Sequence, residues 1–376
     1  MEFRDLNRQY QFLKSDIDKN MRNVIEQANF IQGNQVAELE KILAEFVGVK
    51  HCISCANGTD ALQLALMTWG VGEGDAVFVP DFTFFSSGEV VAAVGAVPIF
   101  VDVDSDTYNI DCDALEKMIC KVNEEKRLKP KVIIAVDLFG QPADFYKIRK
   151  IAEKYQMYVL EDAAQGFGGA IGEKKACSFG DISTTSFFPS KPLGCYGDGG
   201  AVFTDNDEWM DLIKSYKVHG KGSSKYDNVR IGMNSRLDTL QAAVLLAKFL
   251  VFVEKELTWE QSISAEYTKQ LKDFVKTPVI KKDFSSSWAQ YTIQLANKET
   301  RDGLQAYLKE LEIPSAVYYQ KPMHLQLAFS NNSYEDLDYP VTNSLSETVL
   351  SLPFHPYLRD NEIIAVTDAV KQYLRG

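Results

Sequence analysis

One lysine in the middle of the chain has the sequence surroundings of a reactive amine. Lys191 lies in the stretch 184–201, where a β-branched segment runs into two aromatic residues and then a loop rich in glycine and proline. Because Pro189 fixes its own φ and Pro192 disfavours the helical region for the residue before it, we expect Lys191 on a rigid turn. A lysine that is oriented and partly desolvated can form a Schiff base with a carbonyl cofactor. Taken alone, the stretch also fits an ordinary surface lysine in a Gly/Pro loop.

A second candidate is an anion site at a predicted helix start. Asn57 has the character of an N-cap, with Asp60 at the third helical position, and Gly58 and Thr59 leave the first-turn N–H groups without bulky cover. The free donors and the positive end of the helix dipole favour a phosphate group. A capped helix with no ligand gives the same pattern, so this motif is not decisive by itself.

A carboxylate follows the predicted strand at 157–160. Asp162 and Gln165 lie in the run Glu-Asp-Ala-Ala-Gln that ends this strand. An aspartate at a strand end, followed by small residues, could hold a protonated ring nitrogen. The alternative is a plain helix cap.

The elements that position these residues are strands alternating with helices. Near-continuous β-branched runs separated by helical patterns indicate a largely parallel sheet with helices on both faces, and ligands of such sheets bind at the carboxyl ends of the strands. Residues 1–47 are expected to be helical and to pack on this body. The expected strands are 52–56, 76–79, 97–102, 132–136, 157–160, 182–188 and 201–204.

The pattern changes after a predicted helix at 241–252. We therefore expect two domains, a large α/β domain at 1–250 and a small α+β domain at 251–376. A loop at 320–340, carrying His324, is expected to be mobile and to border a site. The predicted later elements are a half-exposed strand at 291–295, an amphipathic helix marked by Leu304, Leu308 and Leu311, a strand at 316–319 and a helix at 361–374.

Composition excludes several classes of protein. With 45% hydrophobic and 24% charged residues in 376, the chain is of ordinary globular type, and a net charge of −12 opposes non-specific nucleic-acid binding. The N-terminus lacks a secretory pattern, and the longest apolar run, 242–253, is interrupted by Lys248 and too short to span a bilayer. We expect a cytoplasmic protein, no membrane contact, no metal and six free cysteines, although the pair Cys52 and Cys55 could be taken for a redox or zinc fragment.

The order of these motifs resembles that of fold-type I pyridoxal-phosphate enzymes, in particular the sugar aminotransferases called the DegT/DnrJ/EryC1/StrS family. The resemblance runs along essentially the whole chain and implies a mostly parallel central sheet with helices on both faces plus a smaller C-terminal α+β domain. Its motifs are most similar to the branch that aminates UDP-2-acetamido-2-deoxy-3-oxo-glucuronate. They lie at 52–62, 161–165, 186–200, 234–238 and 351–358.

The resemblance implies roles for the candidate residues, with pyridoxal 5'-phosphate as cofactor. Lys191 would bind the cofactor as a Schiff base and Asp162 would pair with the pyridinium nitrogen, which keeps the cofactor an electron sink. The phosphate would be held by Gly58, Thr59 and Ser186. The other expected contacts are Phe84 on one ring face, Gln165 at the ring hydroxyl, and Asn234 reaching the phosphate of the neighbouring subunit in a homodimer with shared active sites.

The implied reaction is transfer of an amino group from L-glutamate to a nucleotide-linked keto-sugar, in polysaccharide or lipopolysaccharide biosynthesis. The favoured substrate is a UDP-linked 3-keto N-acetylhexosamine uronate, whose carboxylate Arg236 could bind bidentately. Arg236 could instead pair with Asp238 or with a glutamate across an interface. The other candidate sugar or diphosphate contacts are His219, Lys221, Tyr318, Tyr319 and His324.

One departure from the branch bears on the substrate. Members of the branch often carry histidine where Tyr318 stands, so amination at C4 of a UDP- or dTDP-4-keto-6-deoxy sugar is the alternative within the enzyme class. A related dehydratase subgroup replaces the lysine by histidine, so Lys191 favours transamination.

Two readings from other classes are disfavoured. A nicotinamide dehydrogenase would need G-x-G-x-x-G after the first strand, and the glycines at 70–74 lack that spacing. A catalytically silent regulator on the same fold would not need to keep Lys191, Asp162 and Ser186 together.

Overall fold

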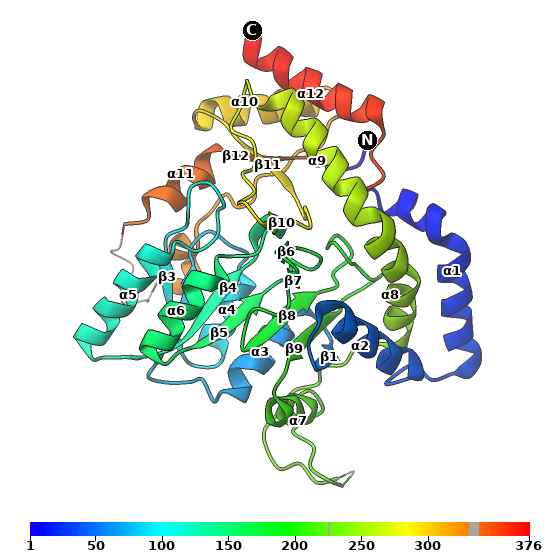
Figure 1. The fold of residues 1–376 in the computed structure, drawn as a ribbon, viewed down its shortest axis with the longest axis vertical. Helices are drawn as coiled ribbons and strands as arrows, with labels where there is room; N and C mark the ends of the chain where they lie inside the picture. The colour runs from blue at the N-terminus through cyan, green and yellow to red at the C-terminus, as the bar shows by residue number, and fades with distance from the viewer. Residues whose placement is uncertain (225, 331–337) are drawn as a thin grey trace.

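The computed structural model describes every residue except 225 and 331–337. Within these residues a seven-stranded sheet forms the centre of the molecule, in the strand order β1-β9-β8-β5-β4-β2-β3 (Figure 1). The strands are β1 (His51–Cys55), β2 (Asp75–Pro80), β3 (Val97–Val101), β4 (Lys129–Val136), β5 (Tyr158–Asp162), β8 (Ile182–Ser186) and β9 (Gly200–Thr204). All seven predicted strands are confirmed.

Most neighbouring strands of this sheet are parallel. The pairs β2–β3, β2–β4, β4–β5 and β5–β8 run parallel, whereas β9 lies antiparallel between β8 and β1. The carboxyl ends of β5 and β8 therefore meet at one edge of the sheet, where Asp162 pairs with Thr184. Asp162 and Ser186 both end their strands at this edge.

Helices cover both faces of the sheet, as predicted for an α/β fold. One face packs against α3 (Gly58–Thr68), α4 (Ser86–Ala93) and α7 (Asp207–Tyr216). Alternate strand residues point to the other face, where Ile133 and Ala135 contribute to a core with α5 and α6, and Phe203 to a core with α2 and α8. These helices are α2 (Asn34–Val47), α5 (Cys112–Glu125), α6 (Phe145–Tyr155) and α8 (Thr239–Val251).

The N-terminal region is helical, but in two pieces. Helix α1 (Leu6–Gln27) ends where Ala28 adopts the left-handed conformation with φ 51°, and α2 begins after Gly33. Helix α1 packs on α8 through Leu13, Ile17 and Val244. The chain start also contacts the C-terminal part, because the Phe354 amide donates to the Phe3 carbonyl at 3.0 Å.

The C-terminal part forms a lobe above the sheet in Figure 1. A π-helical turn (Phe252–Glu256) continues α8 into α9 (Leu257–Leu271), and the two-stranded sheet of β11 (Tyr291–Gln294) and β12 (Val349–Leu352) packs with α10, α12 and α9. The division at residue 250 stays a prediction. The remaining elements are α10 (Lys298–Glu310), α11 (Pro340–Thr348), α12 (Asp360–Arg375) and a three-stranded sheet of β10 (Phe284–Ser285), β6 (Ala170–Ile171) and β7 (Lys174–Lys175).

The strand predicted at 316–319 is wrong. Ala316 forms a single antiparallel bridge with Ser351, and the residues after it turn away from the sheet. In the following loop, short 3₁₀ turns form at 323–325 and 327–329, while residues 331–337 of the loop predicted at 320–340 lie outside the described residues.

Two further findings concern the described residues as a whole. All six cysteines are free thiols, as predicted. In the part of the chain that the structure describes, every helix is too short or too polar to cross a bilayer.

Candidate active site

Lys191 lies in a tight loop directly after β8. Its amide donates to the Phe188 carbonyl at 2.8 Å, and further along the loop the Cys195 amide donates to the Phe187 carbonyl at 2.8 Å. These bonds give the lysine the fixed turn that the two prolines predict. Burial lowers the pKa of Lys191 from its ordinary value, while the Asp162 carboxylate opposes this effect and Arg4 adds to it.

Asp162 ends β5 and is only 4% exposed. Its Oδ2 accepts a hydrogen bond from the Ser87 hydroxyl at 2.8 Å, and its Oδ1 accepts from the Ala164 amide at 3.2 Å. Burial raises the pKa of this carboxyl, and the hydrogen bonds and the nearby charge of Lys191 work in the opposite direction. The arrangement is a buried carboxylate that faces a lysine amine. Ser87, on α4, was not singled out from the sequence.

The start of α3 forms a cradle for an anion. The Asn57 side chain accepts from the Asp60 amide at 2.8 Å, which confirms the predicted N-cap. A Cβ built on Gly58 would lie 2.8 Å from Cβ of Ser186, so the helix start approaches the end of β8 as closely as a glycine allows. The Thr59 hydroxyl lies 2.8 Å from the Ser86 hydroxyl. The structure therefore brings Gly58, Thr59 and Ser186 together.

A polar and aromatic wall connects Gln165 to the C-terminal lobe. Gln165, 3% exposed, accepts from the Phe139 amide at 2.8 Å and donates to the Tyr319 hydroxyl at 2.9 Å. The Tyr319 ring lies 6.3 Å from the ring of Phe84, which is 54% exposed. An exposed phenylalanine at a strand-to-helix junction is available to cover a flat ligand.

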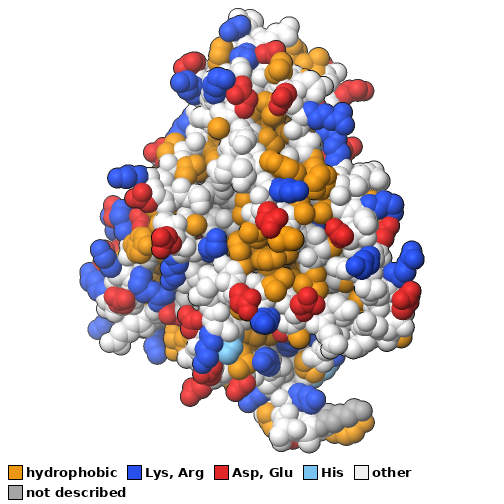
Figure 2. Space-filling view, turned by 45° about the vertical axis from the view of Figure 1, so that its right-hand side comes forward, with side chains coloured by type: hydrophobic (Ala, Val, Ile, Leu, Met, Phe, Trp, Pro, Cys, Tyr) orange, Lys and Arg blue, Asp and Glu red, His pale blue; other side chains and the backbone are white. Residues whose placement is uncertain are grey.

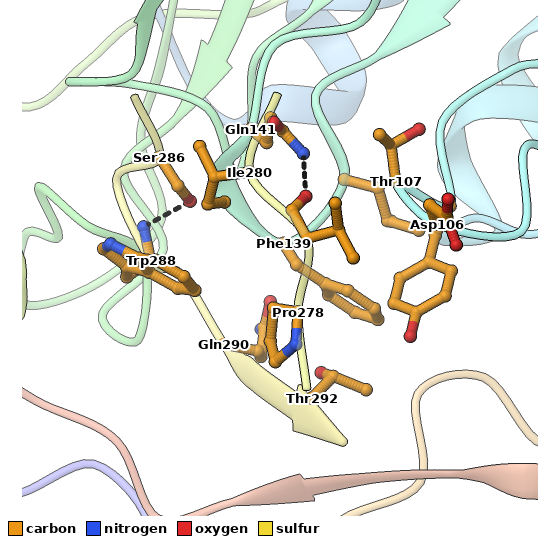
Figure 3. A pocket seen from close by; sticks show the side chains of 13 residues that line it. Asp106, Thr107, Phe139, Gln141, Pro278, Ile280, Ser286, Trp288, Gln290 and Thr292 are labelled. Atoms are coloured by element: carbon orange, nitrogen blue, oxygen red, sulfur yellow. Dashed lines mark hydrogen bonds between the residues drawn. The ribbon is translucent and has the colours of Figure 1, made fainter. Parts of the chain in front are cut away.

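Beside this wall lies a pocket lined by residues of the segments 106–108, 138–141 and 278–292 (Figure 3). Phe139 lines it. The Gln141 side chain donates to the Val279 carbonyl at 3.0 Å, and the Trp288 amide donates to the Ser286 hydroxyl at 3.0 Å. Figure 3 marks both hydrogen bonds with dashed lines. The pocket thus borders Phe139, whose amide donates to the Gln165 side chain. Its lining residues include Asp106, Thr107, Tyr108, Gln290 and Thr292.

Several predicted residues lie on the loop between α7 and α8, which extends away from the body in Figure 1. The His219 amide donates to the Met233 carbonyl at 2.9 Å, and its imidazole is exposed. Arg236 donates to the Asn234 side chain at 2.5 Å, and its buried Nε has no hydrogen-bond partner among the described residues. The neighbouring Ser235 hydroxyl accepts from the Ala56 amide at 3.0 Å, next to the cradle.

The last two predicted contacts lie near the wall, in different settings. Tyr318 is partly buried against Phe3, with ring centroids 6.2 Å apart. His324 is held by Asp81: its Nδ1 lies 2.6 Å from Oδ2 and its amide donates to Oδ1 at 2.8 Å. Asp81, directly after β2, is fully buried, and this pairing was not predicted. A sugar contact by His324 stays a prediction.

The donor set fits a phosphorylated pyridine aldehyde. The cradle offers amides and hydroxyls to a dianion, Asp162 offers a carboxylate to a ring nitrogen, and Lys191 offers an amine to an aldehyde. The absence of a side chain at Gly58 keeps the cradle open, so that a ligand can approach the backbone closely; a Cβ there would narrow the space. Among the described residues, no cluster of three or more His, Cys, Asp or Glu side chains is arranged to hold a metal ion.

Curated relatives cover nearly the whole chain. The chain is 46% identical over 359 residues to the UDP-2-acetamido-2-deoxy-3-oxo-D-glucuronate aminotransferase of Pseudomonas aeruginosa, covering 95% of this chain and 96% of that one. It is 38% identical to a "pleiotropic regulatory protein" of Geobacillus stearothermophilus (99% and 98% covered). It is 37% identical to the UDP-N-acetyl-3-dehydro-alpha-D-glucosamine 3-aminotransferase of Acidithiobacillus ferrooxidans (99% and 97%).

Two solved structures of aminotransferase-type proteins share the fold of this chain. A DegT DnrJ EryC1 StrS aminotransferase from Brucella abortus has a TM-score of 0.97 and 47% identity, covering 100% of both chains. NtdA from Bacillus subtilis, solved with bound cofactor PMP, has a TM-score of 0.91 and 28% identity, covering 100% of this chain and 85% of that one.

The family model described as the DegT/DnrJ/EryC1/StrS aminotransferase family matches residues 11–371. The predicted fold class, aminotransferase activity and pyridoxal-phosphate cofactor are therefore confirmed. The chain belongs to the DegT/DnrJ/EryC1/StrS family of pyridoxal-phosphate-dependent sugar aminotransferases.

Proposed function

We propose that the protein transfers an amino group from L-glutamate to a UDP-linked 3-keto N-acetylhexosamine uronate. The observation that carries the proposal is the partly buried Lys191 next to the buried Asp162, beside an anion cradle, in a chain 46% identical to an enzyme named for such a uronate. Retention of both reactive groups argues against a purely regulatory role of the kind that the name of the Geobacillus relative suggests.

Lys191 is the residue that we assign to covalent binding and proton movement. When bound, the cofactor supplies an aldehyde for the amine and a ring that stabilises negative charge at the reacting carbon. Burial lowers the pKa of Lys191, which increases the fraction of neutral amine available as nucleophile and base near neutral pH. Its Nζ would then be the group that removes and returns the proton at the reacting carbon of the amino donor.

The other residues hold and orient the cofactor in this proposal. Asp162 pairs with the protonated ring nitrogen, and Ser87 keeps that carboxylate oriented. Gly58, Thr59 and Ser186 bind the phosphate. Phe84 covers the ring and Gln165 contacts the ring hydroxyl, while the Gln165–Tyr319 bond ties the site to the C-terminal lobe (2.9 Å).

Arg236 is our candidate for the uronate carboxylate. Its guanidinium is half-buried, and its Nε lacks a partner among the described residues, so an incoming carboxylate would satisfy a donor that the free protein leaves unpaired. The remaining candidate sugar or diphosphate contacts are His219, Lys221, Tyr318, Tyr319 and His324.

The test is single-turnover amination of a panel of UDP- and dTDP-linked 3-keto and 4-keto sugars, with and without a C6 carboxylate, using L-glutamate as donor. We expect the 3-keto uronate to react fastest, and Arg236→Ala to raise its KM by at least about tenfold while leaving neutral sugars unaffected. Faster turnover of a 4-keto-6-deoxy sugar would replace the substrate assignment by the C4 alternative. Equal effects of Arg236→Ala on both sugar classes would exclude the carboxylate role.

We further propose that the active unit is a homodimer in which Asn234 reaches the partner's phosphate site. The projecting loop carries apolar side chains in solvent, with Ile231 90% and Val229 54% exposed, which is unusual for a surface without a partner. Hydrophobic side chains also gather across the face shown in Figure 2. Light scattering on a sizing column should give twice the chain mass, and Ile231→Asp should shift it towards the monomer. A monomeric wild-type protein would refute shared sites.

A further inference from the structure

Four buried ionisable side chains lie outside the roles assigned above, and they lie next to the lysine loop or to one another. They are Arg4 from the N-terminal segment, Lys248 near the end of α8, Glu256 in the π-helical turn and Glu260 in α9. Lys248, Glu256 and Glu260 are at most 2% exposed, and the side chain of Arg4 is 9% exposed. Because burying charge is costly without compensating contacts, the contacts of this cluster indicate what it does.

Both cations donate to backbone carbonyls of the loop that carries Lys191. The Arg4 Nη2 donates to the carbonyl of Lys191 at 3.3 Å and to that of Pro192 at 3.5 Å. The Lys248 Nζ donates to the carbonyl of Gly194. The N-terminal segment and α8, which are far apart in the sequence, thus bind neighbouring peptide groups of the lysine loop. The loop itself has no regular secondary structure.

Two buried acidic side chains lie beside these cations, and burial raises the pKa of the Glu260 carboxyl well above its ordinary value, against the opposing charge of Arg4. Glu260 Oε1 lies 3.7 Å from Nη1 of Arg4. Glu256 accepts from the Gln9 side chain at 2.9 Å and from the Tyr357 hydroxyl at 2.6 Å. Glu256 also faces Lys248, whose pKa burial lowers to about 8 against the opposing effect of that carboxylate. The cluster therefore connects the lysine loop to the helix that joins the two lobes and to both chain ends.

We propose that Arg4 is a positioning residue for Lys191, fixing the lysine's own peptide carbonyl and setting a second positive charge near its amine. This proposal rests on the role of Lys191 proposed above. The charged groups that face the amine are Asp162 from β5, which favours the ammonium form, and Arg4, which disfavours it. Arg4 acts in the same direction as burial, so its removal raises the pKa of Lys191.

Arg8 is a matched control on the same segment. Its guanidinium donates to both carboxylate oxygens of Glu362 at 2.6 Å and to the Tyr357 carbonyl at 3.2 Å. These partners belong to the C-terminal end of the chain, not to the lysine loop. Arg8→Met therefore weakens docking of the N-terminal helix while leaving the Arg4 contacts to the loop in place.

The experiment is competitive acylation of the full-length apoprotein with acetic anhydride across pH, with peptide mass mapping of Lys191. We expect Arg4→Met and Arg4→Gln to move the titration midpoint of Lys191 upward by about half a pH unit or more. Arg4→Lys, which keeps the charge, and Arg8→Met should titrate as wild type. The second uncharged variant, Arg4→Gln, keeps the test available if Arg4→Met fails to fold.

Two results would overturn the proposal. One is an unchanged midpoint in both uncharged Arg4 variants; the other is an equal shift in Arg8→Met, which would mean that Arg4 acts only by docking the segment. In the holoenzyme, Arg4→Gln should lower kcat by about tenfold or more with little change in KM, because positioning acts on the reacting group and not on sugar binding. Because acylation of the apoprotein requires no turnover, the test of Arg4 does not depend on whether the proposed amination reaction is correct.

Discussion

A methyl group added at Gly58 should disrupt the proposed phosphate cradle. The new Cβ would lie 2.8 Å from Cβ, 3.3 Å from Oγ and 3.4 Å from Cα of Ser186. The Cβ and Cα positions are fixed by the β8 backbone, so no rotamer change relieves the contact and the start of α3 must move. Overpacking of this kind costs about 1–3 kcal/mol. If α3 moves away, the phosphate donors separate, and the same free energy appears as a loss of affinity for the cofactor of about 5- to 150-fold.

The assay is titration of the apoprotein with pyridoxal phosphate, followed by absorbance, together with thermal unfolding of the apoprotein. The Gly58→Ala protein should bind pyridoxal phosphate more weakly, unfold at a lower temperature, or do both. The loss of binding free energy and the loss of folding free energy should together amount to about 1–3 kcal/mol. Gly72→Ala is the matched control, since its Cβ would meet only the Val94 carbonyl, at an ordinary 3.6 Å. Ser186→Gly in the Gly58→Ala background should recover stability. Wild-type affinity and stability in Gly58→Ala would refute this account of the cradle.

Two further predictions concern pH. Ser87→Ala removes a hydrogen bond to the ionised Asp162, so the pKa of that carboxyl should rise further and the acidic limb of kcat/KM should move up by about one unit; an unmoved limb would contradict this. Arg8 lowers the pKa of Glu362 from 4.5 to about 2, so the pair stabilises the fold above pH 4.5 and progressively less towards pH 2. In urea unfolding, Glu362→Gln should cost about 1 kcal/mol at pH 7, allowing for solvent screening, and less at pH 3, whereas an equal cost at both would exclude the linkage.

Local signals in the sequence predicted the fold well. Short apolar and β-branched runs predicted every strand of the central sheet, because strands that are buried on both faces form near-continuous hydrophobic runs in the sequence. The cap at Asn57 was equally predictable, since an N-cap and its amide partner, here Asp60, lie three residues apart. The same locality explains why the helix starts and strand ends of the site are predictable from the amino-acid sequence alone.

What the sequence did not reveal depends on contacts between distant segments. Residues 316–319 have strand-forming side chains, but Tyr318 and Tyr319 pack on Phe3, Phe82 and Phe84 instead of extending a sheet, which shows how far context decides β-structure. Ser87 meets a carboxylate 75 residues away, and Arg4 meets the lysine carbonyl 187 residues away. No local pattern marks either side chain.

The proposed chemistry depends on covalent binding of the cofactor by the Lys191 amine, opposite the Asp162 carboxylate. The most direct measurement is borohydride reduction of the cofactor-loaded enzyme followed by peptide mass mapping. We expect one pyridoxyl adduct, on Lys191, and none in Lys191→Ala. An adduct on another lysine, or no adduct in a protein that has bound the cofactor, would contradict it.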